Sequence, residues 1–251
     1  MSDQRRQLDG VRTLIVGASS GIGRAFAMAA HSHGARVAVA ARRIDLLTQL
    51  AAEVDGSAHE LDVSAPNAIQ TVVRDTAETL GGIDAVVFTS AVVPLARVEH
   101  IEPTTWAEAF AVNAVGPALV MRAALPYLSD QAVILIASSD EVGRPRAGVA
   151  AYSASKAALD EILHSWRCEH PHLPVIRVSV GPTADTEILR GADKELLAEL
   201  YDGWARNGQV PVEMSSAADV ANTLVSLITA ARDNPTVVTD SVHFAPRTTK
   251  K

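Results

Sequence analysis

The sequence predicts a single α/β domain built on a parallel sheet with helices on both faces. Short apolar runs alternate with helical patterns along most of the 251 residues, as a parallel sheet with helical crossovers requires. A glycine-rich segment, Gly17–Gly23, separates the first apolar run from the first helical pattern. The hydrophobic content of 48% is enough for one large core, and the length leaves too little chain for a second.

Composition and charge restrict the function classes. The net charge of −7 argues against a nucleic-acid partner. The first residues, 1–7, are polar, and no later apolar run reaches the length needed to cross a bilayer. The one cysteine cannot form an internal disulfide. We therefore expect a cytoplasmic protein with neither nucleic acid nor membrane as a partner.

The first strand, Thr13–Val16, leads into a glycine turn and then a helical pattern through His31. Glycines let the backbone turn tightly and approach a ligand, while exposed N–H groups and the positive end of a helix favour a pyrophosphate. The predicted phosphate-binding residues are Gly17, Ser19, Ser20, Gly21, Ile22 and Gly23.

The second strand, Arg36–Ala40, is followed by Ala41, Arg42 and Arg43. An acidic residue here would bind the ribose hydroxyl of NAD, whereas an arginine pairs with the 2′-phosphate of NADP. The sequence thus favours NADP(H) over NAD(H), with Arg42 as the main phosphate contact and Arg43 stacking on adenine. The alternative is that both arginines are solvated charges at the start of the next helix.

Two further strands are expected at 57–61 and 84–88. Asp62 and Val63 follow the first of them, where Asp62 or Ser64 is also placed to cap the next helix. A long helix over 104–128 carries Asn113, a polar residue that is costly inside an apolar helix unless its amide is used. The alternative role for Asn113 is helix packing alone.

The chemistry is expected where the apolar run 132–137 ends at Ser138 and Ser139. A helix over 150–168 then places Tyr152 and Lys156 at i and i+4, on one face. A nearby cation lowers the pKa of a phenol from its usual ~10, which makes it a general acid or base. Ser139 would hydrogen-bond the substrate oxygen. The loop 140–148 should line the pocket, where Arg144 or Arg146 would meet an anionic substrate unless both are solvated.

The remaining chain completes a seven-stranded sheet. A strand over 175–179, a helical segment over 187–209, a helix over 217–231 and a final strand over 236–244 are expected. The histidine pairs at 31 and 33 and at 170 and 172 lack the spacing of a helical metal site. We therefore predict no metal.

Three motifs together resemble the short-chain dehydrogenase/reductase family in its compact, single-domain form. They are Gly17-x3-Gly21-x-Gly23, Ser139 placed thirteen positions before Tyr152, and Tyr152-x3-Lys156. The resemblance extends from Thr13 to about Phe244 and implies a Rossmann-like, doubly wound fold. It also implies an NADP(H)-dependent oxidoreductase that interconverts a carbonyl and a secondary alcohol. In it Ser139 orients the substrate oxygen, Tyr152 transfers the proton, Lys156 tunes Tyr152 and holds the nicotinamide ribose, and Asn113 bends its helix and holds a water.

The resemblance further implies a single nucleotide-binding domain over 1–251, with a substrate lid at about 187–212. It also implies a homotetramer or homodimer. Leu196, Leu200, Tyr201 and Trp204 would be pocket residues of the lid. The remaining cofactor contacts that it implies are Asp62, Val63, Thr89, Ser90, Ala91, Gly181, Pro182, Thr183 and Thr186.

The chain departs from the family pattern at three places. Val16 stands where a threonine usually precedes the first glycine, residues 88–91 replace Asn-Asn-Ala-Gly, and Val180 replaces a proline. We expect Thr89 to supply the hydroxyl that is lost at Val16. These departures leave one alternative open, a dinucleotide-binding regulator without turnover.

Overall fold

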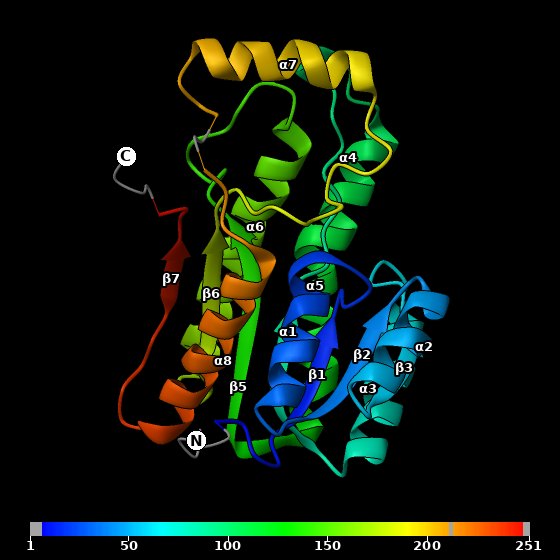
Figure 1. Ribbon diagram of the computed structural model, residues 1–251, viewed down its shortest axis with the longest axis vertical. Helices are drawn as coiled ribbons and strands as arrows, with labels where there is room; N and C mark the ends of the chain where they lie inside the picture. The colour runs from blue at the N-terminus through cyan, green and yellow to red at the C-terminus, as the bar shows by residue number, and fades with distance from the viewer. Residues whose placement is uncertain (1–6, 211–212, 248–251) are drawn as a thin grey trace.

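The computed structural model describes residues 7–210 and 213–247, which form one seven-stranded parallel sheet (Figure 1). The strand order is β3-β2-β1-β4-β5-β6-β7. The predicted α/β fold is confirmed. The strands are β1 (Arg12–Val16), β2 (Arg36–Ala41), β3 (Ser57–Glu60), β4 (Ile83–Phe88), β5 (Leu128–Ser139), β6 (Val175–Val180) and β7 (Ser241–Phe244).

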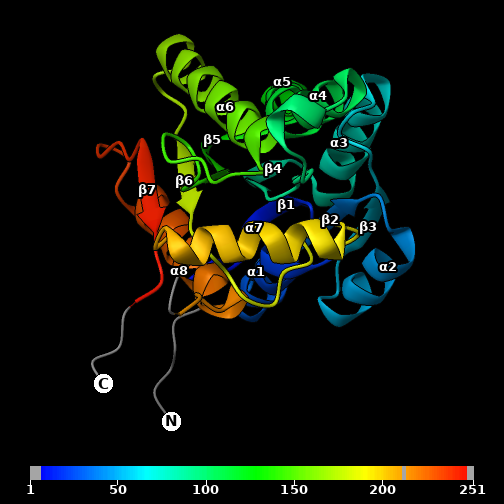
Figure 2. The ribbon, with the colours of Figure 1, turned by 90° about the horizontal axis from the view of Figure 1, so that it is seen from above.

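Helices cover both faces of the sheet, as Figure 2 shows from above. On one face lie α1 (Gly21–Ser32), α2 (Ile44–Glu53) and α8 (Ala217–Asp233). On the other lie α3 (Pro66–Leu80), α4 (Pro103–Phe110), α5 (Gly116–Ala124) and α6 (Ala150–Glu169). Each face has its own apolar core, because central strands buried on both sides present apolar side chains to both layers.

The lid segment contains one helix, α7 (Lys194–Arg206), which lies across the carboxyl edge of the sheet. Its start is fixed by Asp193, whose carboxylate accepts hydrogen bonds from the backbone N–H groups of Glu195 and Leu196 at 2.9 and 3.0 Å. The helix is therefore shorter than the helical segment expected over 187–209. Of the predicted lid, residues 211–212 lie outside the described residues.

The prediction of a single long helix over 104–128 is wrong in detail. A π-helical turn, Ala111–Val115, separates α4 from α5, and a short 3-10 helix, Leu125–Tyr127, ends the run. The whole stretch Pro103–Tyr127 is long and apolar enough to cross a membrane by length and composition alone, which corrects the expectation that no such run exists. Half of its most apolar window is buried inside the domain.

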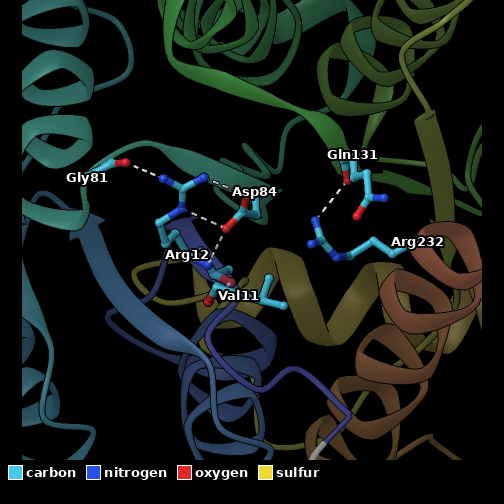
Figure 3. A network of polar contacts seen from close by, with 7 residues as sticks. Val11, Arg12, Gly81, Asp84, Gln131 and Arg232 are labelled. Carbon is cyan, nitrogen blue, oxygen red and sulfur yellow. Dashed lines mark hydrogen bonds and ion pairs between the residues drawn. The ribbon is translucent and has the colours of Figure 1, made fainter.

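The edge of the sheet opposite α7 is held by ionic and polar contacts (Figure 3). The Arg12 guanidinium of β1 donates two hydrogen bonds of 2.8 Å to the Asp84 carboxylate of β4, and the Arg12 backbone N–H donates a third at 2.9 Å. Burial alone would raise the pKa of Asp84, but the hydrogen bonds and the charge of Arg12 outweigh it and hold that pKa well below its usual range. These contacts fasten β1 to β4 far from the carboxyl edge.

Candidate active site

Two cavities of about 840 Å³ each open at the carboxyl edge of the sheet, and they share lining residues such as Thr89 and Thr186. The first lies over the neighbouring strands β1 and β4, where the strand order reverses, the usual ligand position in such sheets. Among predicted cofactor residues, its lining contains Gly17, Ser19, Ser20, Gly21, Ile22, Gly23, Arg42, Arg43, Asp62, Val63, Thr89, Ser90, Ala91 and Thr186.

The glycine turn between β1 and α1 has no room for side chains. Gly17 has a φ of +93°, and a Cβ atom there would lie 2.5 Å from the backbone nitrogen of Ser90. A Cβ atom at Gly23 would collide with the carbonyl oxygen of Gly17. The turn therefore presents bare backbone and the start of α1 to the first cavity, an arrangement that suits the pyrophosphate of a dinucleotide.

The hydroxyl of Thr89 lies where the sequence predicted, against the glycine turn. It donates to the carbonyl oxygen of Val16 at 3.1 Å and lies 3.4 Å from that of Gly17. The Thr89 backbone N–H also donates to the Val16 carbonyl, at 2.8 Å. Thr89 thus braces the turn from β4 and replaces the hydroxyl that is missing at Val16.

The two arginines after β2 differ in their surroundings. Arg43 lies over the glycine turn, where its guanidinium donates to the Ser19 and Ser20 hydroxyls at 3.0 and 2.9 Å and to the Glu187 carboxylate at 2.7 Å. Arg42 is exposed; hydrogen bonds from Ser64 lower the pKa of Asp62, and the charge of Arg42 adds a smaller decrease. Both arginines line the first cavity.

Asp62 also lines the first cavity, but it does not cap α3. Its carboxylate accepts hydrogen bonds from the Ser64 hydroxyl at 2.7 Å and the Ser64 backbone N–H at 2.8 Å. The residue at the N-cap is Ala65, which provides no side-chain hydrogen bond. The capping role expected for Asp62 or Ser64 is therefore wrong, because the short turn at 62–64 already uses both side chains.

Ser139, Tyr152 and Lys156 all line the second cavity. β5 delivers Ser139 at its last residue, and the second turn of α6 brings Lys156 behind Tyr152. Ser139 acts on Tyr152 by lowering its pKa, and the Ser139 Oγ accepts the Glu141 backbone N–H at 3.1 Å. The Lys156 ammonium lies 6.0 Å from the centre of the Tyr152 ring and donates to the Ala137 carbonyl at 2.8 Å.

Burial dominates the titration of this site. It raises the pKa of Tyr152 to about 12, with smaller increases from the charges of Glu141 and Asp140 and a decrease from Ser139. Burial also lowers the pKa of Lys156 to about 8, against the opposing charge of Asp160. The expectation that Lys156 brings the pKa of Tyr152 below 10 is therefore wrong here. Tyr152 is a neutral phenol at pH 7, the form that donates a proton.

Asn113 lies in the π-helical turn, fully buried behind the site rather than in either cavity. Its side-chain amide accepts from the Val92 N–H and donates to the Val92 carbonyl, both at 2.9 Å. It also donates to the Ser155 hydroxyl at 3.0 Å. Asn113 thus joins the loop after β4 to α6 beside the Tyr152 turn. A π-helical turn interrupts the helix at Asn113, and the predicted bend and the predicted water stay predictions.

The segment after β6 lines the second cavity with Gly181, Pro182, Thr183 and Thr186. The Thr183 hydroxyl donates to the Gly181 carbonyl at 2.9 Å. Thr186 lies closer to the glycine turn, since a Cβ atom at Gly21 would be 3.3 Å from its methyl group. Thr186 therefore connects the two cavities, and Thr183 belongs to the second alone.

The loop after Ser139 contains polar contacts that the sequence did not reveal. Glu141 is buried, and Arg146 holds it through its guanidinium and through its backbone N–H at 2.9 Å. The Arg146 guanidinium also lies 4.9 Å over the ring of Trp204 in α7. Arg146 is thus committed to Glu141, which argues against its predicted role toward an anionic substrate. Arg144 is exposed and outside the cavity.

The lid helix provides part of the second cavity. Tyr201 and Trp204 line it as predicted, and Leu197 lines it in place of Leu196 and Leu200. Leu200 of the same helix is instead buried. It packs so closely against Gly148 that a Cβ atom there would collide with the Leu200 side chain. The Trp204 indole N–H donates to the Ala147 carbonyl at 3.0 Å. The lid is therefore fastened to the loop that follows Ser139.

Comparison with known proteins identifies relatives of this chain. The family model for short chain dehydrogenases matches residues 12–196. Versicolorin reductase 1 of Aspergillus parasiticus is 32% identical over 78% of this chain and 78% of its own length. A 28% identical match covers 96% of this chain and 19% of the glycine betaine reductase ATRR of Emericella nidulans, so the chain spans about a fifth of that relative.

A solved structure shares the fold over nearly its whole length. The short chain dehydrogenase from Burkholderia cenocepacia J2315, in complex with NADP, superposes with a TM-score of 0.80 over 94% of this chain and 97% of its own, at 23% identity. The family model matches most of the chain, and the matched residues include the glycine turn after β1 and the site formed by Ser139, Tyr152 and Lys156. The chain belongs to the short-chain dehydrogenase family, whose oxidoreductases act on alcohol or carbonyl groups.

Proposed function

We propose that the chain is an NADP(H)-dependent oxidoreductase that interconverts a carbonyl and a secondary alcohol. The observation that carries this proposal is the placement of Ser139, Tyr152 and Lys156 in a cavity continuous with the one over the glycine turn. NADPH, when bound along the turn, would supply the hydride. NADP(H) is favoured over NAD(H) because Arg42 and Arg43 follow β2 without an acidic residue, and because the Burkholderia structure is a complex with NADP.

In the reductive direction the carbonyl carbon receives the hydride and the carbonyl oxygen receives a proton. The neutral phenol of Tyr152 donates that proton, and the Ser139 hydroxyl hydrogen-bonds the same oxygen as charge develops on it. Lys156 lies behind Tyr152 and holds positive charge close to the phenolate that remains. The alternative of a regulator without turnover has less support, since such a protein does not need these three side chains in one cavity.

Replacing Tyr152 by Phe tests this mechanism. Turnover of a carbonyl substrate should fall by at least ~100-fold, because the proton donor is removed. NADPH binding, measured by fluorescence titration, should change little. Tyr127→Phe is the matched control, because Tyr127 lies in the 3-10 helix outside both cavities. A Tyr152→Phe protein with full activity would refute the role of Tyr152.

We also propose that the protein is a cytoplasmic homodimer or homotetramer. Support comes from the family resemblance and from β7, an edge strand preceded by the exposed Val237 and Val238. Light scattering of the purified protein would measure its mass in solution. A monomeric mass at micromolar concentration would contradict the assembly.

A further inference from the structure

A carboxylate without a side-chain partner lies directly beside the catalytic serine. Asp140 follows Ser139 at the end of β5, and both side chains line the cavity that contains Tyr152. The Asp140 backbone N–H donates to the Val180 carbonyl of β6 at 3.3 Å. A Cβ atom built at Gly181 would lie 3.5 Å from a carboxylate oxygen of Asp140. Asp140 therefore sits between Ser139 and the segment after β6.

The neighbouring carboxylate, Glu141, is in a different situation. The guanidinium and backbone N–H of Arg146 both bind it, and Trp204 covers that guanidinium from the lid. The nearby positive charge is thus already used. Within residues 7–210 and 213–247, the Asp140 carboxylate forms no hydrogen bond or ion pair with another side chain.

The surroundings of Asp140 make this arrangement costly. Apolar side chains, among them Val149, Leu197 and Met214, make up much of the cavity lining. Burial raises the pKa of Asp140 and the charge of Glu141 adds to the increase, whereas Arg146, the Asp140 backbone N–H and His243 oppose it. A carboxylate in such a place destabilises the protein unless a donor satisfies it.

We propose that Asp140 accepts a hydrogen bond from a hydroxyl or ammonium group that the substrate carries next to its reacting carbon. The inference rests on the proposed function, since it assumes that the reacting oxygen lies at Ser139 and Tyr152. Because the Asp140 and Ser139 side chains are neighbours in the chain and line the same cavity, a group held by Asp140 belongs to an atom close to that carbon. The substrate class is then an α-hydroxy or α-amino ketone or aldehyde, or the corresponding alcohol.

Three ketones that differ only at the α-carbon provide the test. Acetophenone, α-hydroxyacetophenone and α-aminoacetophenone have the same ring, which suits the apolar part of the cavity. The ratio of kcat/KM for each substituted ketone to that for acetophenone is measured with NADPH for the wild type, Asp140→Asn and Asp140→Ala. Asp130→Asn is the matched control, because Asp130 is an exposed carboxylate near the other end of the same strand.

The wild type and Asp130→Asn should prefer the substituted ketones, and both Asp140 variants should reduce the ratio by about tenfold, the effect of one hydrogen bond to a charged group. An effect on the amino ketone alone would identify the ammonium as the ligand. Because α-substituents change the intrinsic reactivity of ketones, the variant-to-wild-type comparison is the decisive one. Binding of the substituted ketones to the two Asp140 variants in the absence of turnover, followed by intrinsic tryptophan fluorescence, should weaken in parallel.

The two proposals fail in different ways. Ketone reduction with the same ratios in the wild type and both Asp140 variants would overturn the role of Asp140 and leave the proposed function standing. If the wild type reduces no carbonyl compound with either nucleotide, the proposed function fails and the role of Asp140 fails with it. Thermal unfolding of each variant shows whether it is folded. Asp140→Ala and Asp140→Asn both remove the carboxylate, so the two variants should change the ratios in the same direction.

Discussion

The guanidinium of Arg43 forms an ion pair of 2.7 Å with the carboxylate of Glu187, which lies at the start of the lid segment. The same guanidinium donates to Ser19 and Ser20 on the glycine turn. The Arg43 side chain thus connects the glycine turn to the lid segment along the lining of the first cavity. A nucleotide phosphate that binds Arg43 must compete with Glu187 for the same donors.

Glu187→Gln should strengthen NADPH binding about threefold, because it removes an exposed competing charge whose pair with Arg43 is weak. NADH binding should change less, since NADH lacks the 2′-phosphate. Fluorescence titration with both nucleotides measures the two affinities. Glu195→Gln, an exposed carboxylate of α7, is the control. Weaker NADPH binding by Glu187→Gln would show that the pair helps to build the site.

Arg42→Ala should weaken NADPH binding about tenfold and leave NADH binding nearly unchanged. Arg42 is exposed at the end of β2 and lines the first cavity, so a phosphate can reach it without displacing another partner. The same titration, repeated at higher salt, should show a smaller difference. Equal losses for both nucleotides would mean that Arg42 shapes the loop instead of binding the phosphate.

Lys156→Met should stabilise the protein at pH 7 while it removes activity. Burial lowers the pKa of Lys156 from 10.5 to about 8. The charged ammonium therefore destabilises the folded state below pH 8, and this destabilisation disappears as the pH rises to 10.5. We expect a gain of about 2 kcal/mol in the free energy of unfolding at pH 7, vanishing near pH 10.5. Urea denaturation at both pH values measures it, with the exposed Lys194→Met as control.

Asp84→Asn should lower the free energy of unfolding by about 2 kcal/mol at pH 7, because it leaves Arg12 without its carboxylate. The folded-state pKa of Asp84 is lowered, so its contribution is full above the unfolded pKa near ~3.9 and is lost as pH falls below that value. The difference in the free energy of unfolding between wild type and variant should therefore become smaller in acid. A gap that stays constant from pH 7 to pH 3 would refute this account. Asp45→Asn, an exposed carboxylate in α2, is the control.

The sequence predicted the fold and many of the residues that line the two cavities, because both depend on local patterns. Apolar runs, glycine spacing and the i, i+4 pair of Tyr152 and Lys156 are all visible within a few residues. Contacts between distant segments left no such signal. The bonds from Asn113 to Val92 and Ser155 connect residues 21 and 42 positions apart, and the Arg43 pair with Glu187 spans 144.

The pKa of Tyr152 shows a second limit. The i, i+4 spacing of Lys156 was sufficient to predict that a cation lies nearby, but not how completely the site is buried. Burial is a property of the assembled sheet, loop and lid. It outweighs the local pair and reverses the direction of the shift.

The π-helical turn at Ala111–Val115 makes the length of this helix part of its function. A π turn holds one residue more than an α-helical turn would, and Asn113 in this turn donates to Ser155 of α6. Deleting a single alanine from the turn would restore a regular helix and rotate everything on one side of it by about 100° relative to the other. The Asn113 side chain would then point away from Val92 and Ser155. Across relatives, insertions and deletions should therefore be rarer in these five residues than substitutions are.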